Sequence, residues 1–223
     1  MVALPFRDRH HAGCVLAAKL AHYGGRPDVL VLALPRGGVA VGFEVARALQ
    51  APLDVLMVRK LGFPGQEEYA MGAIARGATG GVRVMNPLTG LTVSPALVDA
   101  VVAREQAELL RREQLYRGER PAISLAGRCV IVVDDGLATG ATMRAALRAI
   151  RQQQPARLVA AVPVGAGDSC LALHDEADEV VCAATPQPFR AVGLWYEEFP
   201  QASDDEVRSL LHQAYRAQAL TLQ

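Results

Sequence analysis

The sequence has no surplus of charge of either sign and no long apolar run. Its 223 residues include 23 lysines and arginines against 23 aspartates and glutamates. Without a basic field, we expect neither nucleic acid nor a membrane as a partner. The longest apolar runs, such as residues 29–35, are too short to cross a bilayer, and the first residues show no signal-peptide core. These absences predict a soluble, cytoplasmic protein.

Cysteine is scarce, and neither cysteine nor histidine has metal spacing. The four cysteines, at positions 14, 129, 170 and 182, form no C-x-x-C pair. We therefore expect reduced thiols rather than metal ligands or a disulfide framework. The histidines show no H-E-x-x-H spacing, and no G-x-S-x-G motif is present. Zinc chemistry and serine hydrolysis are therefore not indicated.

Apolar segments that alternate with helical patterns indicate a parallel sheet. A helix within residues 6–23 precedes a buried strand at 29–34, a helix at 38–49 and a strand at 53–59. The same order returns later, with strands at 129–133, 157–162 and 179–183 and helices at 140–152 and 167–174. Strand, helix, strand order gives right-handed crossovers. We predict an α/β fold with a doubly wound, mostly parallel sheet flanked by helices, in a single domain spanning 1–223.

The alternation is interrupted between residues 61 and 125. Glycine and proline at 62–65 predict an irregular segment, and short strands follow near 69–75 and 82–85. A long helix from Pro95 to Tyr116 comes next, and its mixed charges suit an exposed or dimer-forming surface. We predict an inserted excursion here. After the last sheet strand, residues 184–223 form a separate covering segment that ends in a helix at 204–218.

The most informative segment is 130–142, where an apolar strand ends at two adjacent aspartates and a small-residue turn opens a helix. A strand buried on both faces opens its carboxyl end toward a ligand crevice. Two carboxylates there need cations or hydroxyl donors, which Mg²⁺ and vicinal ribose hydroxyls supply. The turn at 138–142 lets backbone N–H groups surround a phosphate at the positive end of the helix. The pattern favours a phosphate and ribose site over a plain strand-end turn with a helix cap.

These residues resemble the loop that binds phosphoribosyl pyrophosphate (PRPP) in the type I phosphoribosyltransferases. The family pattern is an apolar strand, two acids, two mostly apolar residues and a small-Thr-Gly-x-Thr turn. The resemblance implies the type I phosphoribosyltransferase fold with a flexible lid and a small hood, a Mg²⁺ cofactor and a homodimer. It assigns the ribose and 5′-phosphate of PRPP to Asp134, Asp135, Gly136, Leu137, Ala138, Thr139, Gly140, Ala141 and Thr142.

Two positions of this loop qualify the resemblance. Gly136 departs from the pattern, because the family usually has a larger apolar residue there. Ala138 stands where the hypoxanthine-guanine enzymes carry an aspartate, whereas the adenine enzymes have Ala-Thr-Gly, as here. The resemblance implies that Asp134 and Asp135 hold Mg²⁺, directly or through water, and that both are catalytic together with Lys60.

Two basic elements fit the pyrophosphate of PRPP. Arg36, Gly37 and Gly38 follow the first sheet strand, where glycines allow close approach of the backbone to an anion and the next helix presents free N–H groups. Arg59 and Lys60 end the next predicted strand and resemble the Arg-Lys pair of the orotate and adenine enzymes. The plain alternatives are a strand-to-helix turn for the first element and a solvated strand end for the second.

The lid and the hood complete the resemblance. Residues 61–80 resemble the loop that closes over PRPP, with Glu67, Glu68 and Tyr69 as lid residues, although exposed glutamates are usually just solvated. The hood candidates for a base pocket are Phe189, Trp195 and Tyr196. Aromatic faces stack on heterocycles, but core packing explains the same residues.

Together these features predict a transferase that joins a nitrogen nucleophile, such as a nucleobase, to the ribosyl C1 of PRPP and releases pyrophosphate. The other class is a non-catalytic protein that senses PRPP or a nucleotide on the same fold. The sequence shows no basic stripe or appended helix-turn-helix for that role. Because fold does not fix function, the acceptor base or amine stays open.

Overall fold

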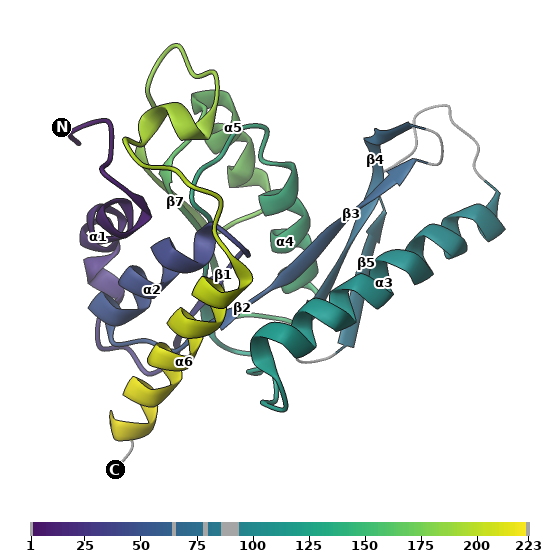
Figure 1. Ribbon diagram of the computed structural model, residues 1–223, viewed down its shortest axis with the longest axis horizontal. Coiled ribbons are helices and arrows are strands. Elements are labelled where there is room, and N and C mark those ends of the chain that lie inside the picture. The colour runs from purple at the N-terminus through teal and green to yellow at the C-terminus, as the bar shows by residue number, and fades with distance from the viewer. Residues whose placement is uncertain (1, 64–65, 78–79, 86–93, 222–223) are drawn as a thin grey trace.

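Two sheets of different kinds organise the computed structural model, which describes residues 2–63, 66–77, 80–85 and 94–221 (Figure 1). The larger is a parallel sheet with strand order β2-β1-β6-β7-β8. Its strands are β1 (Val29–Ala33), β2 (Leu53–Val55), β6 (Cys129–Val133), β7 (Arg157–Val164) and β8 (Glu179–Ala184). The smaller is an antiparallel sheet of β3 (Met57–Phe63), β4 (Gln66–Gly77) and β5 (Gly80–Met85).

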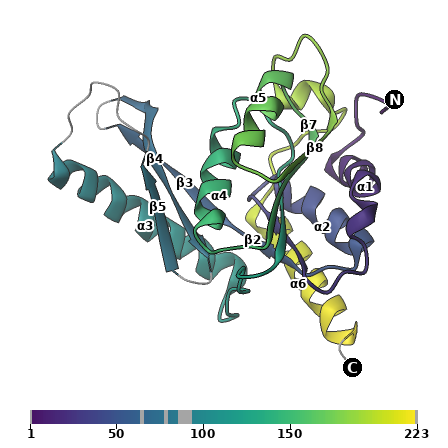
Figure 2. The ribbon, with the colours of Figure 1, turned by 180° about the vertical axis from the view of Figure 1, so that it is seen from behind.

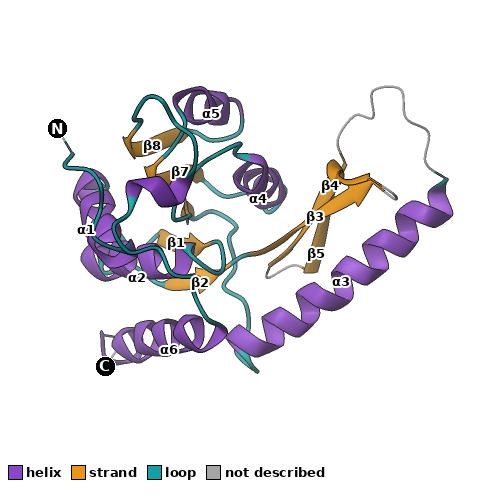
Figure 3. Cartoon of the chain, turned by 45° about the horizontal axis from the view of Figure 1, so that its top comes forward, coloured by secondary structure: helices purple, strands orange, loops and turns teal. Residues whose placement is uncertain are grey.

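Helices cover both faces of the parallel sheet. On one face lie α1 (Arg9–Lys19), α2 (Gly38–Leu49) and α6 (Asp204–Thr221), and on the other α4 (Ala141–Arg151) and α5 (Gly167–Ala172) (Figures 1 and 3). Alternate residues of β1 enter the two cores: Val29, Val31 and Ala33 join one, and Leu30 and Leu32 the other. This two-sided burial explains the unbroken apolar strands, and the predicted doubly wound fold is confirmed.

The smaller sheet and a long helix form a lobe beside the parallel sheet. Helix α3 (Pro95–Arg117) runs along β3, β4 and β5 and returns to the main body at its carboxyl end (Figures 1 and 2). Ser94 caps it as predicted, by accepting a hydrogen bond from the Leu97 amide, and it ends at Gly118 with φ of 62°. Three short 3₁₀ helices, at 21–23, 173–175 and 192–195, complete the fold.

One prediction next to the excursion was wrong. Residues 53–59 are not one strand, because the chain leaves the parallel sheet after Val55 and enters the antiparallel sheet at Met57. In the segment predicted to be irregular, Gly62 belongs to β3, where the register of the β3–β4 pair shifts on both sides of it, and residues 64–65 lie outside the described part of the structure. Glycine within a strand is typical of such a bulge.

The prediction of four reduced cysteines was also wrong. Cys170 of α5 and Cys182 of β8 form a disulfide, with Cα atoms 6.6 Å apart, whereas Cys14 and Cys129 are free thiols. The pairing arises because α5 packs against β8, and spacing along the chain does not reveal that contact. Within the described residues, no helix is both long and apolar enough to cross a membrane.

A buried ion pair joins α3 to the parallel sheet. Arg117 at the end of α3 is 4% exposed and donates to Asp54 of β2, which is 2% exposed, over 3.1 and 3.3 Å. The Tyr215 hydroxyl of α6 also donates to Asp54, over 3.1 Å. The prediction that α3 is an exposed surface is therefore wrong at the carboxyl end of the helix, where the buried pair of Arg117 and Asp54 holds the lobe to the main body.

Candidate functional site

The two aspartates lie at the carboxyl end of β6, in the middle of the parallel sheet. Asp134 follows Val133, and its carboxylate accepts a hydrogen bond from the Asp135 amide over 2.9 Å. Burial and, secondarily, repulsion from Asp135 raise the pKa of Asp134 well above its usual range. Ionisation of Asp134 beside Asp135 is therefore costly, and a cation or hydroxyl donors would reduce that cost.

Asp135 is held by residues from both ends of the chain. The Arg9 Nε donates to Asp135 Oδ2 over 2.8 Å, and the Tyr196 hydroxyl donates to the Asp135 carbonyl oxygen over 2.5 Å. Arg9 was not predicted as a site residue. It lies 126 positions from Asp135, and no local motif marks it.

The turn after the aspartates is anchored at Leu137 and at Ala138, whose carbonyl oxygen accepts from the Ser169 hydroxyl over 2.5 Å. Leu137 donates its N–H to the Val164 carbonyl and accepts from the Ala166 N–H, both over 2.9 Å. Gly140 adopts φ of 72° and opens α4, with no side chain capping the helix start. The side chains of Thr139 and Thr142 are exposed. An uncapped helix start with neighbouring hydroxyls is suited to an anion such as phosphate.

The Arg36-Gly37-Gly38 turn, between β1 and α2, packs directly against the aspartates. A Cβ atom built on Gly37 would lie 1.9 Å from Asp135 Oδ2, and one built on Gly38 would lie 2.8 Å from the Val133 carbonyl oxygen. Position 38 therefore requires glycine, and a side chain at position 37 would displace the Asp135 carboxylate. The Pro35–Arg36 peptide bond is cis. The structure thus brings together two of the predicted loops, which are about 100 residues apart in the sequence.

Arg36 itself is partly exposed beside this contact. Its guanidinium lies 3.9 Å from Asp204 at the start of α6, and the Tyr116 hydroxyl of α3 donates to the same carboxylate. Burial of Tyr116 and its bond to Asp204 raise the pKa of the tyrosine to about 12, so the phenol stays protonated at neutral pH. Among the described residues, Arg36 therefore has one weak, solvated ion-pair partner, and its guanidinium can turn toward an anion.

The second basic element does not end a strand of the parallel sheet. Arg59 and Lys60 lie within β3, in register with Ile74 and Ala73 of β4. The Arg59 guanidinium is bonded to Glu105 of α3 over 2.7 and 2.8 Å. The predicted strand end was wrong, because the strand continues in the antiparallel sheet. The Lys60 side chain lies outside the described part of the structure.

The predicted lid residues belong to the same sheet. Glu67, Glu68 and Tyr69 form part of β4, and their side chains also lie outside the described part of the structure.

The aromatic residues of the hood pack together over the loop at 134–142, which we call the acid loop. Phe189 and Trp195 stack with ring centroids 6.3 Å apart. Tyr196 is only 6% exposed and packs on Phe6, so its ring has no open face for a base. A Cβ atom on Gly136 would lie 2.3 Å from Val192 of the hood. This contact explains the departure from the family pattern, since a larger residue at 136 would displace the hood.

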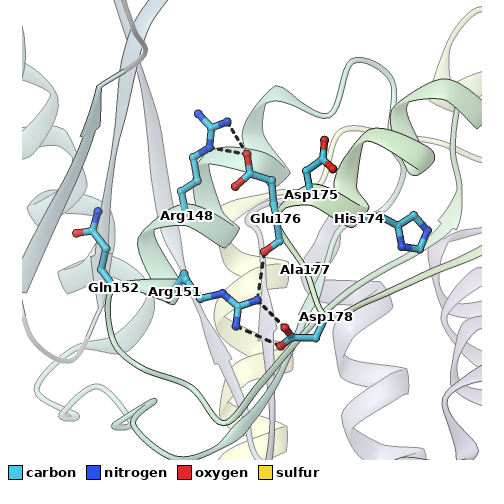
Figure 4. A pocket seen from close by; sticks show the side chains of 8 residues that line it. All are labelled: Arg148, Arg151, Gln152, His174, Asp175, Glu176, Ala177 and Asp178. Atoms are coloured by element: carbon cyan, nitrogen blue, oxygen red, sulfur yellow. Dashed lines mark hydrogen bonds and ion pairs between the residues drawn. The ribbon is translucent and has the colours of Figure 1, made fainter.

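A separate groove of about 530 Å³ lies at the far end of α4 (Figure 4). Both of its arginines are paired with lining carboxylates: Arg148 with Glu176, and Arg151 with Asp178. Arg151 is the last residue of α4, whereas the turn at 138–142 lies at the start of that helix. At 1.5 Å per residue the two lie about 16 Å apart, so this groove is not part of the candidate site.

Comparisons with known proteins agree with this geometry. A family model described as "Phosphoribosyl transferase domain" matches residues 12–192. The Mycobacterium tuberculosis protein named "Putative phosphoribosyl transferase Rv0571c" is 50% identical over 213 residues, which is 95% of this chain and 47% of that protein. This chain therefore spans about half the length of that curated relative.

Two further matches differ in their reach. The crystal structure of TT1426 from Thermus thermophilus matches with a TM-score of 0.83 and 42% identity, over 94% of this chain and 99% of that one. The protein named "Bifunctional protein PyrR" from Deinococcus radiodurans is 31% identical over 120 residues, covering 52% of this chain and 64% of that protein. The first similarity extends over the lobe and hood as well as the sheet.

Proposed function

This chain belongs to the phosphoribosyl transferase domain family, and from that premise we propose that it transfers the 5-phosphoribosyl group of PRPP to a nitrogen nucleophile. The reaction breaks the bond between C1 and pyrophosphate and forms a bond between C1 and nitrogen. The observation that carries the proposal is the direct contact of Gly37 with Asp135. This contact supports the proposal, because a substrate with phosphates on both sides of a ribose needs an anion loop beside the carboxylate that we assign to the ribose.

Each part of PRPP has a matching part of the site. The 5′-phosphate is assigned to the turn at 138–142 and the start of α4, and the ribose hydroxyls to Asp134 and Asp135. Pyrophosphate is assigned to Arg36, Gly37 and Gly38, of which the half-buried Gly37 adjoins Asp135. Three subsites in a row hold the ribose carbon in place for attack.

The donor set suits Mg²⁺ that arrives with the substrate. Mg²⁺ is commonly bound by one or two carboxylates and by substrate phosphates, and Asp134 and Asp135 are two adjacent carboxylates. Among the described residues, no group of three or more His, Cys, Asp or Glu side chains could hold a metal alone. When bound, the ion supplies positive charge that neutralises the departing pyrophosphate. The protein's part is to orient the ribose and to stabilise charge with fixed N–H groups.

The remaining predicted residues have conditional roles. We assign Arg59 and Lys60 to pyrophosphate, and for Arg59 this requires exchange of its ion pair with Glu105. The segment that holds Glu67, Glu68 and Tyr69 is assigned to the exclusion of water, within the lid and excursion of 61–125. Residues 184–223 supply the hood, where Phe189 and Trp195 are the candidates for stacking on a base. Tyr196 instead supports Asp135 through its hydroxyl.

The test is release of pyrophosphate from Mg²⁺ and PRPP with a panel of purine, pyrimidine and pyridine bases and simple amines. We expect release that depends on one acceptor and is lost in the variant carrying Asp134→Asn and Asp135→Asn. Asp205→Asn is the matched control, because this carboxylate is fully exposed on α6. Unchanged PRPP affinity in the double variant would overturn the assignment of the acid loop.

The same assay separates a transferase from a sensor. A protein that senses PRPP binds it tightly but releases no pyrophosphate with any acceptor. Release with one acceptor supports the transferase, and tight binding without release supports the sensor.

A further inference from the structure

Arg9 connects the proposed ribose site to the hood. It lies in the first turn of α1, and its Nε donates to Asp135 Oδ2 over 2.8 Å. Its NH1 donates to the Pro200 carbonyl oxygen over 2.7 Å. The guanidinium carbon also lies 3.9 Å above the centre of the Phe199 ring. One side chain therefore contacts an acid-loop residue and two hood residues.

The segment before Arg9 is built into the hood by its backbone. Phe6 donates its N–H to the Trp195 carbonyl oxygen over 2.8 Å and accepts from the Glu197 N–H over 2.7 Å. Arg7 accepts from the Glu198 N–H over 2.8 Å. The backbone just before Arg9 is therefore held in place by the hood, and this positions the Arg9 side chain toward Asp135.

The pair between Arg9 and Asp135 is shielded from water. The Arg9 side chain is 11% exposed and the Asp135 side chain 17%. Gly37 lies against both partners, since a Cβ atom there would lie 3.0 Å from Arg9 Nε and 1.9 Å from Asp135 Oδ2. A charge-assisted hydrogen bond in such surroundings fixes the carboxylate more firmly than an exposed one does. It also leaves only Oδ1 of Asp135 to turn toward a ligand.

We propose that Arg9 is a positioning residue for ribose: it holds Asp135 Oδ2 so that Oδ1 faces a ribose hydroxyl, and it ties that geometry to the hood. This proposal rests on the proposed function, because it assumes that Asp135 binds ribose. Arg9 does not touch the ribose itself. Its loss should weaken ligands that carry a ribose, whereas inorganic phosphate, which needs only the turn at 138–142, should bind as before.

The experiment compares dissociation constants of ribose 5-phosphate, inorganic phosphate and Mg²⁺ with PRPP, by calorimetry or NMR titration. In Arg9→Gln we expect the constants for ribose 5-phosphate and PRPP to rise about tenfold or more, as loss of a charged hydrogen bond implies. The constant for phosphate should stay within about twofold of the wild-type value. Arg9→Lys should recover part of the loss, because it restores the charge but cannot make both bonds. Arg208→Gln is the control, since Arg208 pairs only with exposed Asp205 among the contacts of the described residues.

A second variant keeps the test informative if Arg9→Gln is unstable. Phe199→Leu removes the ring under the guanidinium and keeps the charge, and it should weaken ribose 5-phosphate about threefold without a change for phosphate. Equal affinity of wild type and Arg9→Gln for ribose 5-phosphate would overturn the role of Arg9. Equal losses for ribose 5-phosphate and phosphate would also overturn it, by indicating general damage. A wild-type protein that binds neither PRPP nor ribose 5-phosphate would instead overturn the proposed function.

Discussion

Replacement of Arg117 by methionine should destabilise the protein more than any exposed ion pair could. The side chain makes two bonds to Asp54, one bond of 3.0 Å to the Val55 carbonyl oxygen and a close pair with Glu113. The variant leaves the Asp54 carboxylate buried with only the Tyr215 hydroxyl and the Val55 N–H as donors among the described contacts. Removing one partner of a buried pair costs about 3–5 kcal/mol.

Urea unfolding followed by circular dichroism measures this cost, and Arg111→Met is the control on the same helix. Arg111 pairs with Glu108, and this pair together with Arg112 lowers the pKa of Glu108 to about 2. The Arg111 side chain is 59% exposed, so solvent screening limits the cost to about 1 kcal/mol or less. The double variant of Arg117→Met and Asp54→Leu should lose less than Arg117→Met alone, because the Asp54 charge is no longer buried without its guanidinium partner.

The reasoning fails if Arg117→Met unfolds within about 1 kcal/mol of Arg111→Met. That result would mean that Asp54 finds other compensation, through water or through protonation. Typical domains have only about 5–15 kcal/mol of stability, so the expected loss is a large share of the total. The Arg117→Met replacement would also release the lobe, formed by α3 and the antiparallel sheet, from β2.

Three further predictions concern the site and the disulfide. Gly37→Ala should stay folded but lose at least about tenfold in PRPP affinity, because the added methyl group meets the Asp135 carboxylate. Gly167→Ala is the control, since a Cβ atom there would lie no closer than 4.0 Å to a neighbouring atom, Gln187 Nε2. Asp134→Asn should lose PRPP binding yet raise the melting temperature at pH 7–8. The pKa of Asp134 is higher in the folded than in the unfolded protein, so the wild type loses stability as pH rises from about 4 and this carboxyl group ionises. Below that pH the melting temperatures of the variant and the wild type should therefore be equal. A melting temperature below wild type at pH 8 would contradict this. Replacing Cys170 and Cys182 by serine should lower the free energy of unfolding by about 3 kcal/mol, as expected for a closed loop of this size, whereas Cys14→Ser should not. Four reactive thiols in unreduced, denatured wild type would refute the disulfide.

The sequence allowed prediction of the elements whose physics is local. Strands such as 129–133 were identifiable because residues buried on both faces must all be apolar. The start and end of α3 followed from Ser94, Pro95 and Gly118, since helix caps depend on neighbouring residues. The ordered acids, glycines and threonines of 134–142 likewise form one continuous loop. Its chemistry depends on backbone N–H groups that the same loop supplies.

Features that join distant segments could not be predicted in this way. Arg9 reaches Asp135 across 126 positions, and Cys170 meets Cys182 only because α5 docks on β8. The break after Val55 depends on competition between two sheets for one extended chain, and both sides of the break have strand-like sequences. Gly136 departs from the family pattern because Val192 of the hood packs against it, and no local pattern relates these two residues.

The order of the residues was enough to predict the doubly wound sheet and to single out the loop that we propose binds phosphate and ribose. Hydrophobic periodicity and backbone conformation act over a few residues, and they are written directly in the order of the chain. Only the tertiary structure decided that Gly37 lies against Asp135, that Arg9 holds this carboxylate and that Arg59 pairs with Glu105. Such contacts depend on how helices and sheets pack, and packing brings together side chains that no local pattern relates.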